Sequence, residues 1–444
     1  MKKILIASLS IVVAFTVFAL VALNKGGQTK TLYLLNWGEY IDEELFDVFE
    51  EETGIQVVQE CVTSSETMYQ KIKAGTTAYD VAIPGDYMIT KLYNDNLLYK
   101  IDTQNYENIK DYDSIFDDNL TFLRNKYMAD TMEYCMPYFW GAYSMVYSTR
   151  YEGNKDVVTE NGFKALFDKS LYTDHKAKTG MYDTARWAIS AYYMSQDIDP
   201  NTEAFVTNTA EKNALIKGIK NASFDMWGND ALKRKTASGD IDICFTQLGD
   251  FFDAVYLALD EGMGEDIGLD ALPFDVYVPG NTSAFFDGMC IPKTSKHQDY
   301  ANMFINFMLD TDNAFDNALA IGYSPALKSV QQLFIDNPDE EYFSNDEIYV
   351  SLKDLTEKYP FYLNPLISAS DISDVSMLES KESDYLTACE AVINQSKSSV
   401  DTNDNLGTAL CIITLTVLVG GIALYTTLYF VKRNRKKKKL ARNA

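Results

Sequence analysis

The sequence predicts an α/β protein of two lobes with a transmembrane helix at each end. Short β-rich runs alternate with helical stretches, which indicates the α/β class. The chain has 444 residues, more than the ~250–300 that one hydrophobic core supports, so we expect more than one folded unit. Two long uncharged runs near the termini predict the membrane helices.

The first part of the chain reads as three strands separated by two helices. We expect strands at Thr31–Trp37, Ile55–Cys61 and Tyr79–Ile83, with helices that begin after Asp42 and after Ser64 or Ser65. The alternation recurs later, with strands expected at 180–182, 240–245 and 283–291 and helices at 184–195, 250–260 and 300–309. Alternation of this kind predicts a parallel sheet with helices on its faces.

The amino terminus predicts a signal or anchor segment and a linker over residues 1–30. Ile4–Leu23 is an uncharged run of 20 residues that follows Lys2 and Lys3. That length suffices to cross a bilayer and exceeds the ~7–15 apolar residues of an ordinary signal peptide. The sequence therefore favours an uncleaved anchor, with cleavage after Ala19 or Ala22 as the alternative.

The carboxyl terminus predicts a second membrane helix at 406–431, a run of 26 uncharged residues that follows a polar linker at 394–405. Residues 432–444 carry eight basic side chains and no acidic one, which places this tail in the cytoplasm by the positive-inside rule. Lys2 and Lys3 belong on the same side. We therefore expect both termini in the cytoplasm and the folded middle outside the cell membrane.

Charge and cysteine content exclude several classes of protein. The net charge is −25 despite the basic tail, so the outer part is strongly acidic and nucleic acid is not expected as a partner. None of the six cysteines forms a Cys-x-x-Cys pair, and one of them, Cys411, lies inside the second expected membrane helix. A disulfide framework or zinc site is therefore not expected, and we interpret the cysteines as small buried apolar residues.

Aromatic and acidic residues follow the ends of the predicted strands. Ligands of open parallel sheets bind outside the carboxyl ends of the strands, so these residues are the candidate binding site. Aromatic faces attract ammonium groups and carboxylates accept their hydrogen bonds, a combination suited to a cationic amine. An alternative role for Asp42 and Asp250 is to cap the amino termini of helices instead of binding a ligand. The candidates are Trp37, Glu39, Tyr40, Gly85, Asp86, Tyr87, Asp183, Thr184, Gln247, Asp250, Phe285 and Asp287.

Sequence signatures of catalysis are missing. The chain has only two histidines, no G-x-S-x-G elbow, no H-E-x-x-H motif and no EF-hand loop. The glycines of Gly262–Gly268 have the wrong spacing for a dinucleotide loop. We therefore expect no enzyme, no metal and no cofactor, with a surface glycosidase as a remaining alternative because paired acids cannot be read from one sequence.

Five segments resemble the spermidine/putrescine-binding proteins of bacterial ABC importers. They are Asn36–Tyr40, Ser64–Lys73, Ala78–Pro84, Met136–Ala142 and Ile321–Tyr323. The resemblance implies a two-lobed, type II periplasmic-binding-protein-like fold that closes on its ligand like a hinged trap. Lobe 1 would comprise 31–137 and about 285–320, and lobe 2 would comprise 138–284 and about 321–393.

Carried over position by position, the resemblance implies roles for individual side chains. Trp37 and Tyr40 would contact the amine chain, Asp287 would hold an ammonium, and Phe285 would take the place of a stacking Trp. Further positions that match pocket residues of the family are Tyr87, Asp250 and Tyr323.

Some positions depart from the family pattern. Gly85 replaces a Ser, Gln247 replaces a Trp, and Thr184 and Trp187 stand where spermidine-type members carry acids. A shorter diamine or another amine-bearing solute thus becomes a candidate. We expect a membrane-tethered receptor that captures a polyamine for an ABC permease; the alternatives are a tethered ligand sensor and a binding protein for another amine.

Overall fold

The computed structural model describes residues 30–397 apart from 110–111, 261–267, 346–347 and 382. Within these residues no helix has both the length and the apolar character needed to cross a bilayer. The expected fold class was therefore wrong in its membrane helices, and the two-lobed α/β fold alone is retained. The segments for which those helices were expected, 4–23 and 406–431, lie outside the described residues.

The first lobe is built on parallel strands. β1 (Lys30–Trp37) pairs with β2 (Ile55–Val62) and with β3 (Val81–Ala82). Gly54 ends α2 (Glu44–Thr53) in the left-handed conformation, with φ at 68°. Ser64 caps α3 (Ser65–Ala74), its hydroxyl accepting a hydrogen bond from the Thr67 amide. α4 (Asp86–Asn94) follows β3 after Gly85.

The second lobe repeats this arrangement. β6 (Thr179–Tyr182) pairs in parallel with β7 (Met226–Gly228) and β8 (Ile243–Gln247). Each of these strands leads directly into a helix: α9 (Ala185–Ser195), α12 (Asp230–Ala237) and α13 (Leu248–Asp260). The carboxyl ends of the strands thus lie beside helix amino termini.

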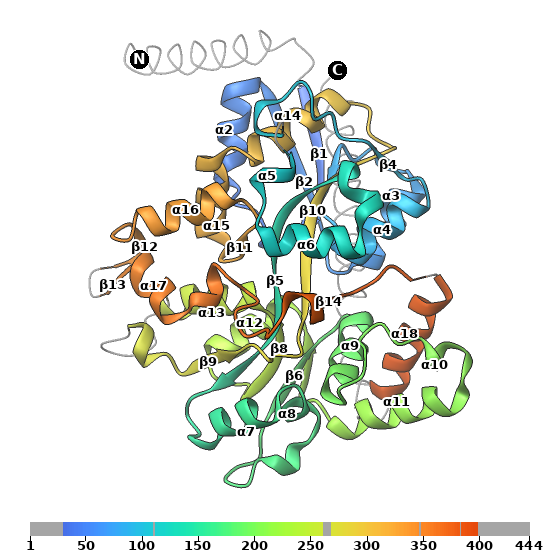
Figure 1. The fold of residues 1–444 in the computed structure, drawn as a ribbon, viewed down its shortest axis with the longest axis vertical. Coiled ribbons are helices and arrows are strands. Elements are labelled where there is room, and N and C mark those ends of the chain that lie inside the picture. Colours follow the sequence, from blue (N-terminus) through green and yellow to red (C-terminus); the bar gives the residue numbers. More distant parts are fainter. Residues whose placement is uncertain (1–29, 110–111, 261–267, 346–347, 382, 398–444) are drawn as a thin grey trace, which may run out of the picture. The chain divides into compact units, whose positions relative to one another are not determined.

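Two long strands join the lobes. β5 (Cys135–Ser148) and β10 (Ser283–Pro292) run antiparallel to each other and are buried along their whole length (Figure 1). β10 pairs with β3 of the first lobe, and β5 pairs with β8 of the second, so the strand order is β2-β1-β3-β10-β5-β8-β6-β7. The sheet is therefore mixed, and the expectation of a parallel sheet was wrong at its centre, because β10 is antiparallel to β3 and β5 is antiparallel to β8.

The remaining elements cover these sheets. The long strands also pair with β4 (Leu98–Tyr99), β9 (Phe274–Tyr277), β11 (Ser324–Pro325) and β14 (Ser376–Met377), and β12 (Glu341–Ser344) pairs with β13 (Tyr349–Ser351). The other helices are α5 (Tyr112–Ile115), α6 (Asp118–Tyr127), α7 (Gly153–Asn161), α8 (Lys164–Phe167), α10 (Ala204–Thr207), α11 (Thr209–Ala222), α14 (Gln298–Met308), α15 (Thr311–Ile321), α16 (Lys328–Asp336), α17 (Leu352–Lys358) and α18 (Ser383–Lys397). α18 extends four residues into the linker expected at 394–405, which is thus helical at its start.

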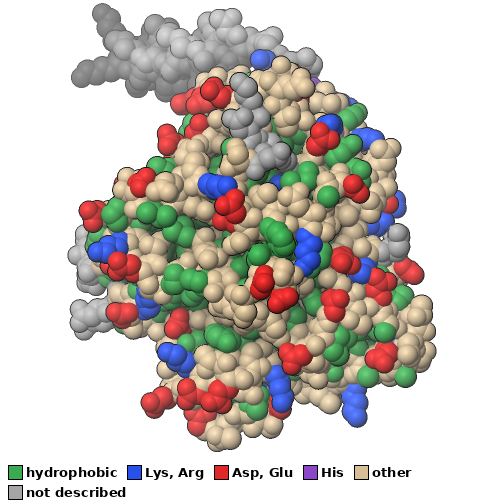
Figure 2. Space-filling view, in the orientation of Figure 1, with side chains coloured by type: hydrophobic (Ala, Val, Ile, Leu, Met, Phe, Trp, Pro, Cys, Tyr) green, Lys and Arg blue, Asp and Glu red, His purple; other side chains and the backbone are tan. Residues whose placement is uncertain are grey.

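The surface carries charges of both signs. Figure 2 shows acidic and basic side chains interspersed over one face of the molecule, without a continuous basic area. This distribution agrees with a solubilising surface and directs attention to the interior for a binding site.

Candidate functional site

A cavity of about 260 Å³ opens where strand ends of the two lobes meet. Small-molecule pockets usually measure ~300–1,000 Å³, so this cavity suits a small ligand. Residues from β1 and β2 of the first lobe, from β6 and β8 of the second, and from β10 contribute to it, together with residues that follow these strands. Its lining is Trp37, Gly38, Tyr40, Cys61, Val62, Thr63, Tyr182, Trp187, Asn229, Gln247, Asp250, Asp287 and Tyr323.

Asp287 supplies the first buried carboxylate of the cavity. It lies on β10, where a register shift separates it from Gly288, and it is 6% exposed. The Tyr40 hydroxyl donates a hydrogen bond of 2.7 Å to Asp287 Oδ2. A Cβ atom on Gly85 would lie 3.1 Å from Asp287 Oδ1. The glycine at this position therefore leaves space beside this carboxylate.

Asp250 supplies the second buried carboxylate, from the first turn of α13. The Tyr323 hydroxyl donates a hydrogen bond of 2.7 Å to Asp250 Oδ1 and lies 3.1 Å from Gln247 Oε1. The rings of Tyr40 and Tyr323 meet edge to face, with 4.9 Å between their centroids. Two tyrosine–aspartate pairs thus stand side by side in one cavity, each contributing one carboxylate.

Burial controls the ionisation of both acids. Removal from water raises the pKa of Asp250 to about 8, although the Tyr323 hydrogen bond opposes the rise. Burial likewise raises the pKa of Asp287 to about 7 against the Tyr40 hydrogen bond. A cation placed between the two carboxylates would reverse these shifts, because an opposite charge stabilises the ionised form.

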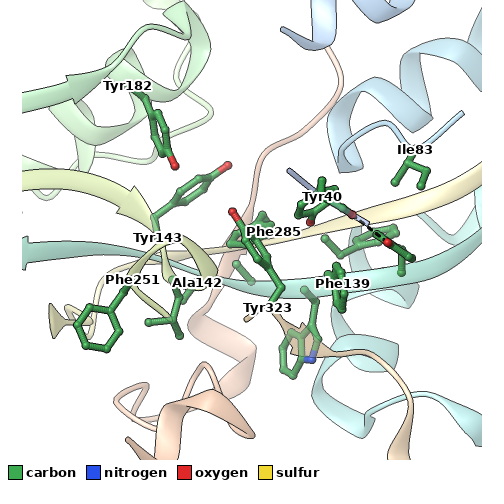
Figure 3. Packing of buried hydrophobic residues seen from close by; sticks show 14 of the residues in the cluster. Tyr40, Ile83, Phe139, Ala142, Tyr143, Tyr182, Phe251, Phe285 and Tyr323 are labelled. Carbon is green, nitrogen blue, oxygen red and sulfur yellow. Dashed lines mark hydrogen bonds between the residues drawn. The ribbon is translucent and has the colours of Figure 1, made fainter. Parts of the chain in front are cut away.

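Aromatic side chains form the walls of the cavity. The indole of Trp37 is oriented by a 2.8 Å hydrogen bond from its Nε1 to the carbonyl of Ile83. Trp187 packs against Tyr182 with 5.3 Å between ring centroids. The hydroxyl groups of Tyr182, Tyr143 and Tyr323 point toward one another (Figure 3). The site therefore offers π faces and hydroxyl groups around two carboxylates.

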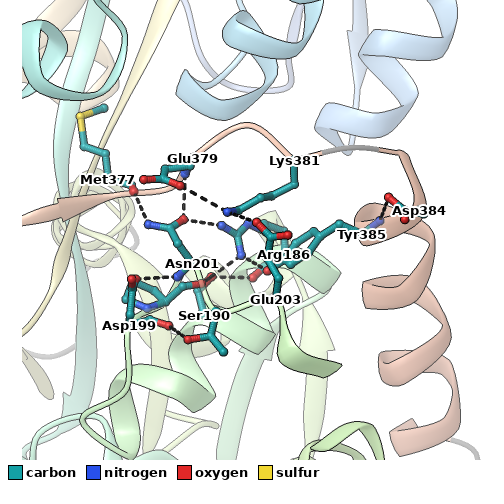
Figure 4. A network of polar contacts seen from close by, with 12 residues as sticks. Arg186, Ser190, Asp199, Asn201, Glu203, Met377, Glu379, Lys381, Asp384 and Tyr385 are labelled. Carbon is teal, nitrogen blue, oxygen red and sulfur yellow. Dashed lines mark hydrogen bonds and ion pairs between the residues drawn. The ribbon is translucent and has the colours of Figure 1, made fainter. Parts of the chain in front are cut away.

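A buried polar network anchors the helix that carries Trp187. Arg186, the neighbouring residue in α9, donates hydrogen bonds to Pro200 O at 3.0 Å, to Asn201 Oδ1 at 2.7 Å and to the Tyr385 hydroxyl (Figure 4). The amide of Asn201 reaches Met377 O at 2.9 Å. These hydrogen bonds attach the segment that contains Met377 and Tyr385 to the second lobe.

The structure brings seven of the predicted binding residues to the cavity. They are Trp37, Tyr40, Trp187, Gln247, Asp250, Asp287 and Tyr323. Their roles in binding stay predictions.

Four other predicted residues do not line the cavity. Tyr87 is buried and its hydroxyl donates to Glu66 Oε1 at 3.3 Å, while Thr184 precedes the first turn of α9. Phe285 is buried, with its ring 6.3 Å from that of Tyr323. Glu39 has a positive φ of 52° and pairs with Arg234.

Two contacts join the lobes at the rim of the cavity. Arg234 Nη1 of α12 lies 3.1 Å from Glu39 Oε1, and both side chains are more than half exposed. Asn229 Nδ2, just after β7, donates a hydrogen bond of 3.0 Å to Thr63 O, just after β2. Asn229 also lines the cavity, so this residue contributes both to the contact between the lobes and to the wall of the site.

Several lining residues were not predicted from the sequence. Tyr182 ends β6, Val62 ends β2, Thr63 follows β2, and Asn229 follows β7. All of them obey the strand-end rule that located Trp37 and Gln247. The rule missed Asn229 because β7 is only three residues long and was not recognised as a strand.

Comparison with known proteins identifies the class to which this fold and site belong. The model of the bacterial extracellular solute-binding protein family matches residues 44–348. The chain therefore belongs to this family of transport binding proteins, and it is not an enzyme. This result confirms the resemblance seen in the sequence and removes the glycosidase alternative.

Individual relatives agree in fold and length. The spermidine/putrescine-binding periplasmic protein of Escherichia coli K12 is 28% identical over 330 residues, which cover 71% of this chain and 86% of the relative. A putrescine/cadaverine-binding protein of Pseudomonas aeruginosa is 27% identical, covering 76% of this chain and 92% of the relative. The structure of a spermidine/putrescine ABC transporter substrate-binding protein from Streptococcus pneumoniae aligns with this structure with a TM-score of 0.58 at 26% identity. The alignment covers 83% of this chain and 99% of that protein.

Proposed function

We propose that this protein is an extracytoplasmic receptor that captures a short diamine such as putrescine and delivers it to an ABC importer. The observation that carries the proposal is the pair of buried carboxylates, Asp287 and Asp250, in one small aromatic cavity. Each carboxylate can accept the charge-assisted hydrogen bonds of one ammonium group. The names of the relatives, which bind spermidine, putrescine or cadaverine, support the same ligand class.

The number and chemistry of the polar groups favour a diamine over other solutes. An amino acid or a sugar acid would bring its own carboxylate against Asp287 and Asp250, and like charges repel in a buried site. A neutral sugar would leave two buried acids without a counter-charge. An alkyl diamine places one cation at each acid and its methylene groups against the rings of Trp37 and Trp187.

Calorimetric titration of the full-length chain tests this assignment. We expect putrescine and cadaverine to bind and butylamine, which lacks the second ammonium, to bind at least tenfold more weakly. Glucose and glutamate serve as controls and should give no heat of binding. Binding of a sugar or an acidic amino acid without any binding of a diamine would overturn the assignment.

The proposed site makes ligand binding dependent on pH. Because burial raises the pKa of Asp287 to about 7 and that of Asp250 to about 8, the empty site holds protons near neutral pH. An ammonium ion favours the ionised acids, so binding releases protons and affinity rises with pH. We expect the Kd for putrescine to fall at least about tenfold between pH 6 and pH 8.5, by calorimetry in buffers of matched ionic strength.

The stability of the ligand-free protein should change in the opposite direction. The folded state binds protons that the unfolded chain, with ordinary aspartate pKa values near ~3.9, has already lost. The contribution of these acids to the free energy of unfolding therefore decreases as pH rises toward about 8. A double Asp250→Asn, Asp287→Asn variant should lose this part of the pH dependence. For the binding prediction, a putrescine Kd that is constant between pH 6 and pH 8.5 would show that both acids are ionised in the empty protein over this range of pH.

The contact of Asn229 with Thr63 should hold the closed form together. A net hydrogen bond contributes ~0.5–1.5 kcal/mol, and affinity changes within one binding site act mainly through dissociation. We expect Asn229→Ala to raise the dissociation rate of putrescine about threefold to tenfold in stopped-flow fluorescence, with little change in the association rate. Arg234→Gln is the matched control and should change the rate less than about twofold, because its ion pair is exposed to solvent. Equal rates for the wild type and Asn229→Ala would exclude a closing role for this contact.

A further inference from the structure

Two cysteines distant in sequence face each other across the central strand pair. Cys135 is the first residue of β5, and Cys290 lies near the end of β10 as its direct partner in the antiparallel register. Directly opposed residues on such strands project from the same face with Cβ atoms ~4.5–5.5 Å apart, and a disulfide needs ~3.5–4.5 Å. The backbone is therefore within a small adjustment of disulfide geometry.

Both thiol groups are fully buried. The Cys290 thiol donates a hydrogen bond of 3.7 Å to the carbonyl oxygen of Gly288, and the Cys135 thiol donates one of 3.6 Å to the carbonyl oxygen of Thr131. The neighbouring Cys290 thiol and the nearby Arg124 guanidinium lower the pKa of Cys135 to about 7 despite burial. Burial raises the pKa of Cys290. The thiolate form, which is the nucleophile in disulfide chemistry, is thus favoured at Cys135.

Arg124 gives this pair a built environment. Its Nη2 lies 3.6 Å from Cys135 Sγ and 3.3 Å from the carbonyl oxygen of Cys135. The guanidinium group is buried and stacks 5.3 Å from the ring centroid of Phe286. A positive charge fixed beside one of two adjacent thiols is the arrangement that activates a cysteine. Cys135 and Cys290 are buried as expected, and Arg124 gives Cys135 a charged neighbour.

We propose that Cys135 and Cys290 are joined by a disulfide formed with a thiol–disulfide oxidant. The Cys135 thiolate attacks one sulfur of the oxidant, whose other sulfur leaves as a thiol after taking up a proton. Cys290 then attacks the mixed disulfide at Cys135 and releases the second thiol. Two cysteine thiols lose two electrons and two protons in total, and the oxidant is reduced to two thiols. Because both sulfur atoms are buried in the folded protein, the exchange takes place while β10 is pairing with β5.

The other described cysteines have different surroundings. Cys61 is exposed at the cavity, which corrects the expectation that it is buried. Cys244, on β8, is opposed by Val146 on β5 and by Gly180 on β6. Its Sγ lies 3.2 Å from the Thr236 hydroxyl. Cys244 is thus a matched control for Cys290, since both are buried strand cysteines and only Cys290 faces Cys135.

Refolding under defined redox conditions tests the proposal. The full-length chain is unfolded with reductant and refolded with oxidised glutathione or with reductant, then alkylated in denaturant and digested. We expect a Cys135–Cys290 linked peptide and four alkylated cysteines of six after oxidative refolding. A crosslink that closes a loop of more than ~100 residues constrains the unfolded chain strongly, so the Tm should be about 5 °C higher in the oxidised form.

The variants separate this disulfide from a general effect of oxidant. Cys290→Ala should abolish both the linked peptide and the reductant-sensitive part of the Tm, whereas Cys244→Ala should keep both. Cys135→Ser should have the same two effects as Cys290→Ala, because it removes the other sulfur atom of the pair. Alkylation of all six cysteines after oxidative refolding of the wild type, or a linked peptide between any other two cysteines, would overturn the proposal.

Discussion

Asp287→Asn is expected to weaken putrescine binding by a hundredfold or more. The carboxylate is buried on the strand shared by both lobes and accepts the Tyr40 hydroxyl at 2.7 Å. Loss of one partner of a buried ion pair costs ~3–5 kcal/mol, and ~1.4 kcal/mol corresponds to a factor of ten. Asn keeps the shape of the side chain and an oxygen that can accept the hydrogen bond from Tyr40. Calorimetric titration at pH 8.5, where the wild-type acid is largely ionised, gives the ratio of Kd values.

A structural role for Asp287 predicts a different outcome. If the acid served only to hold Tyr40, the Asn variant would melt at a lower temperature and bind putrescine as the wild type does. We expect instead that the ligand-free variant is at least as stable as the wild type at this pH, because a buried charge has been removed. Trp37→Leu is the companion variant: it should cost roughly tenfold in affinity, since a cation–π contact contributes ~0.5–2 kcal/mol.

Asp250→Asn is expected to remove the preference for two amino groups. It should weaken putrescine binding by about thirtyfold or more and change butylamine binding less than about threefold, because a monoamine can still bind at Asp287. The difference arises from the second ammonium alone, which loses the carboxylate held by Tyr323. The ratio of the two Kd values, measured by calorimetry for both proteins, reports the role of Asp250 directly.

Asp253→Asn is the matched control for this experiment. Asp253 lies on the same helix, α13, and its charge contributes to the raised pKa of Asp250, but it does not line the cavity. The Asp253→Asn substitution removes the same formal charge outside the site. It should therefore leave the ratio of diamine to monoamine affinity within about twofold of wild type. If Asp250→Asn weakened both amines equally, Asp250 would act on the whole cavity rather than on one ammonium.

Local sequence features predicted the parts of the fold that are determined locally. The β-rich run at Thr31–Trp37 and the stop at Gly54 correspond to β1 and to the left-handed end of α2. Strand ends converge at the same edge of a sheet, so the rule that selected Trp37 and Gln247 also selected neighbours in space. Asp287 lies instead in the middle of β10, and it reaches the cavity because this strand crosses between the lobes. Sequence order and elementary sheet geometry were sufficient for this much of the site.

Other features depend on contacts that the sequence does not display. All 14 residues of β5 are buried, so the strand lacks the alternation of polar and apolar residues by which strands are recognised. Glu39 follows β1 as predicted, but its backbone conformation, with φ at 52°, accompanies a side chain that pairs with Arg234 at the rim. The two membrane helices were predicted from uncharged length alone, and the described part of the chain contains no such helix.

The origin of the two carboxylates from different parts of the fold has a consequence for the empty receptor. Closure without a ligand would take Asp287 and Asp250 out of water together, with no cation between them. Each acid would then have to keep an unsolvated charge, which is unfavourable at any pH, or acquire a proton, which becomes less favourable as pH rises. Empty closure is therefore self-limiting, and a transporter that responds to the closed form would seldom be triggered by a receptor without cargo. Under the proposed function, the same two acids would both hold the cargo and limit transport cycles started by an empty receptor.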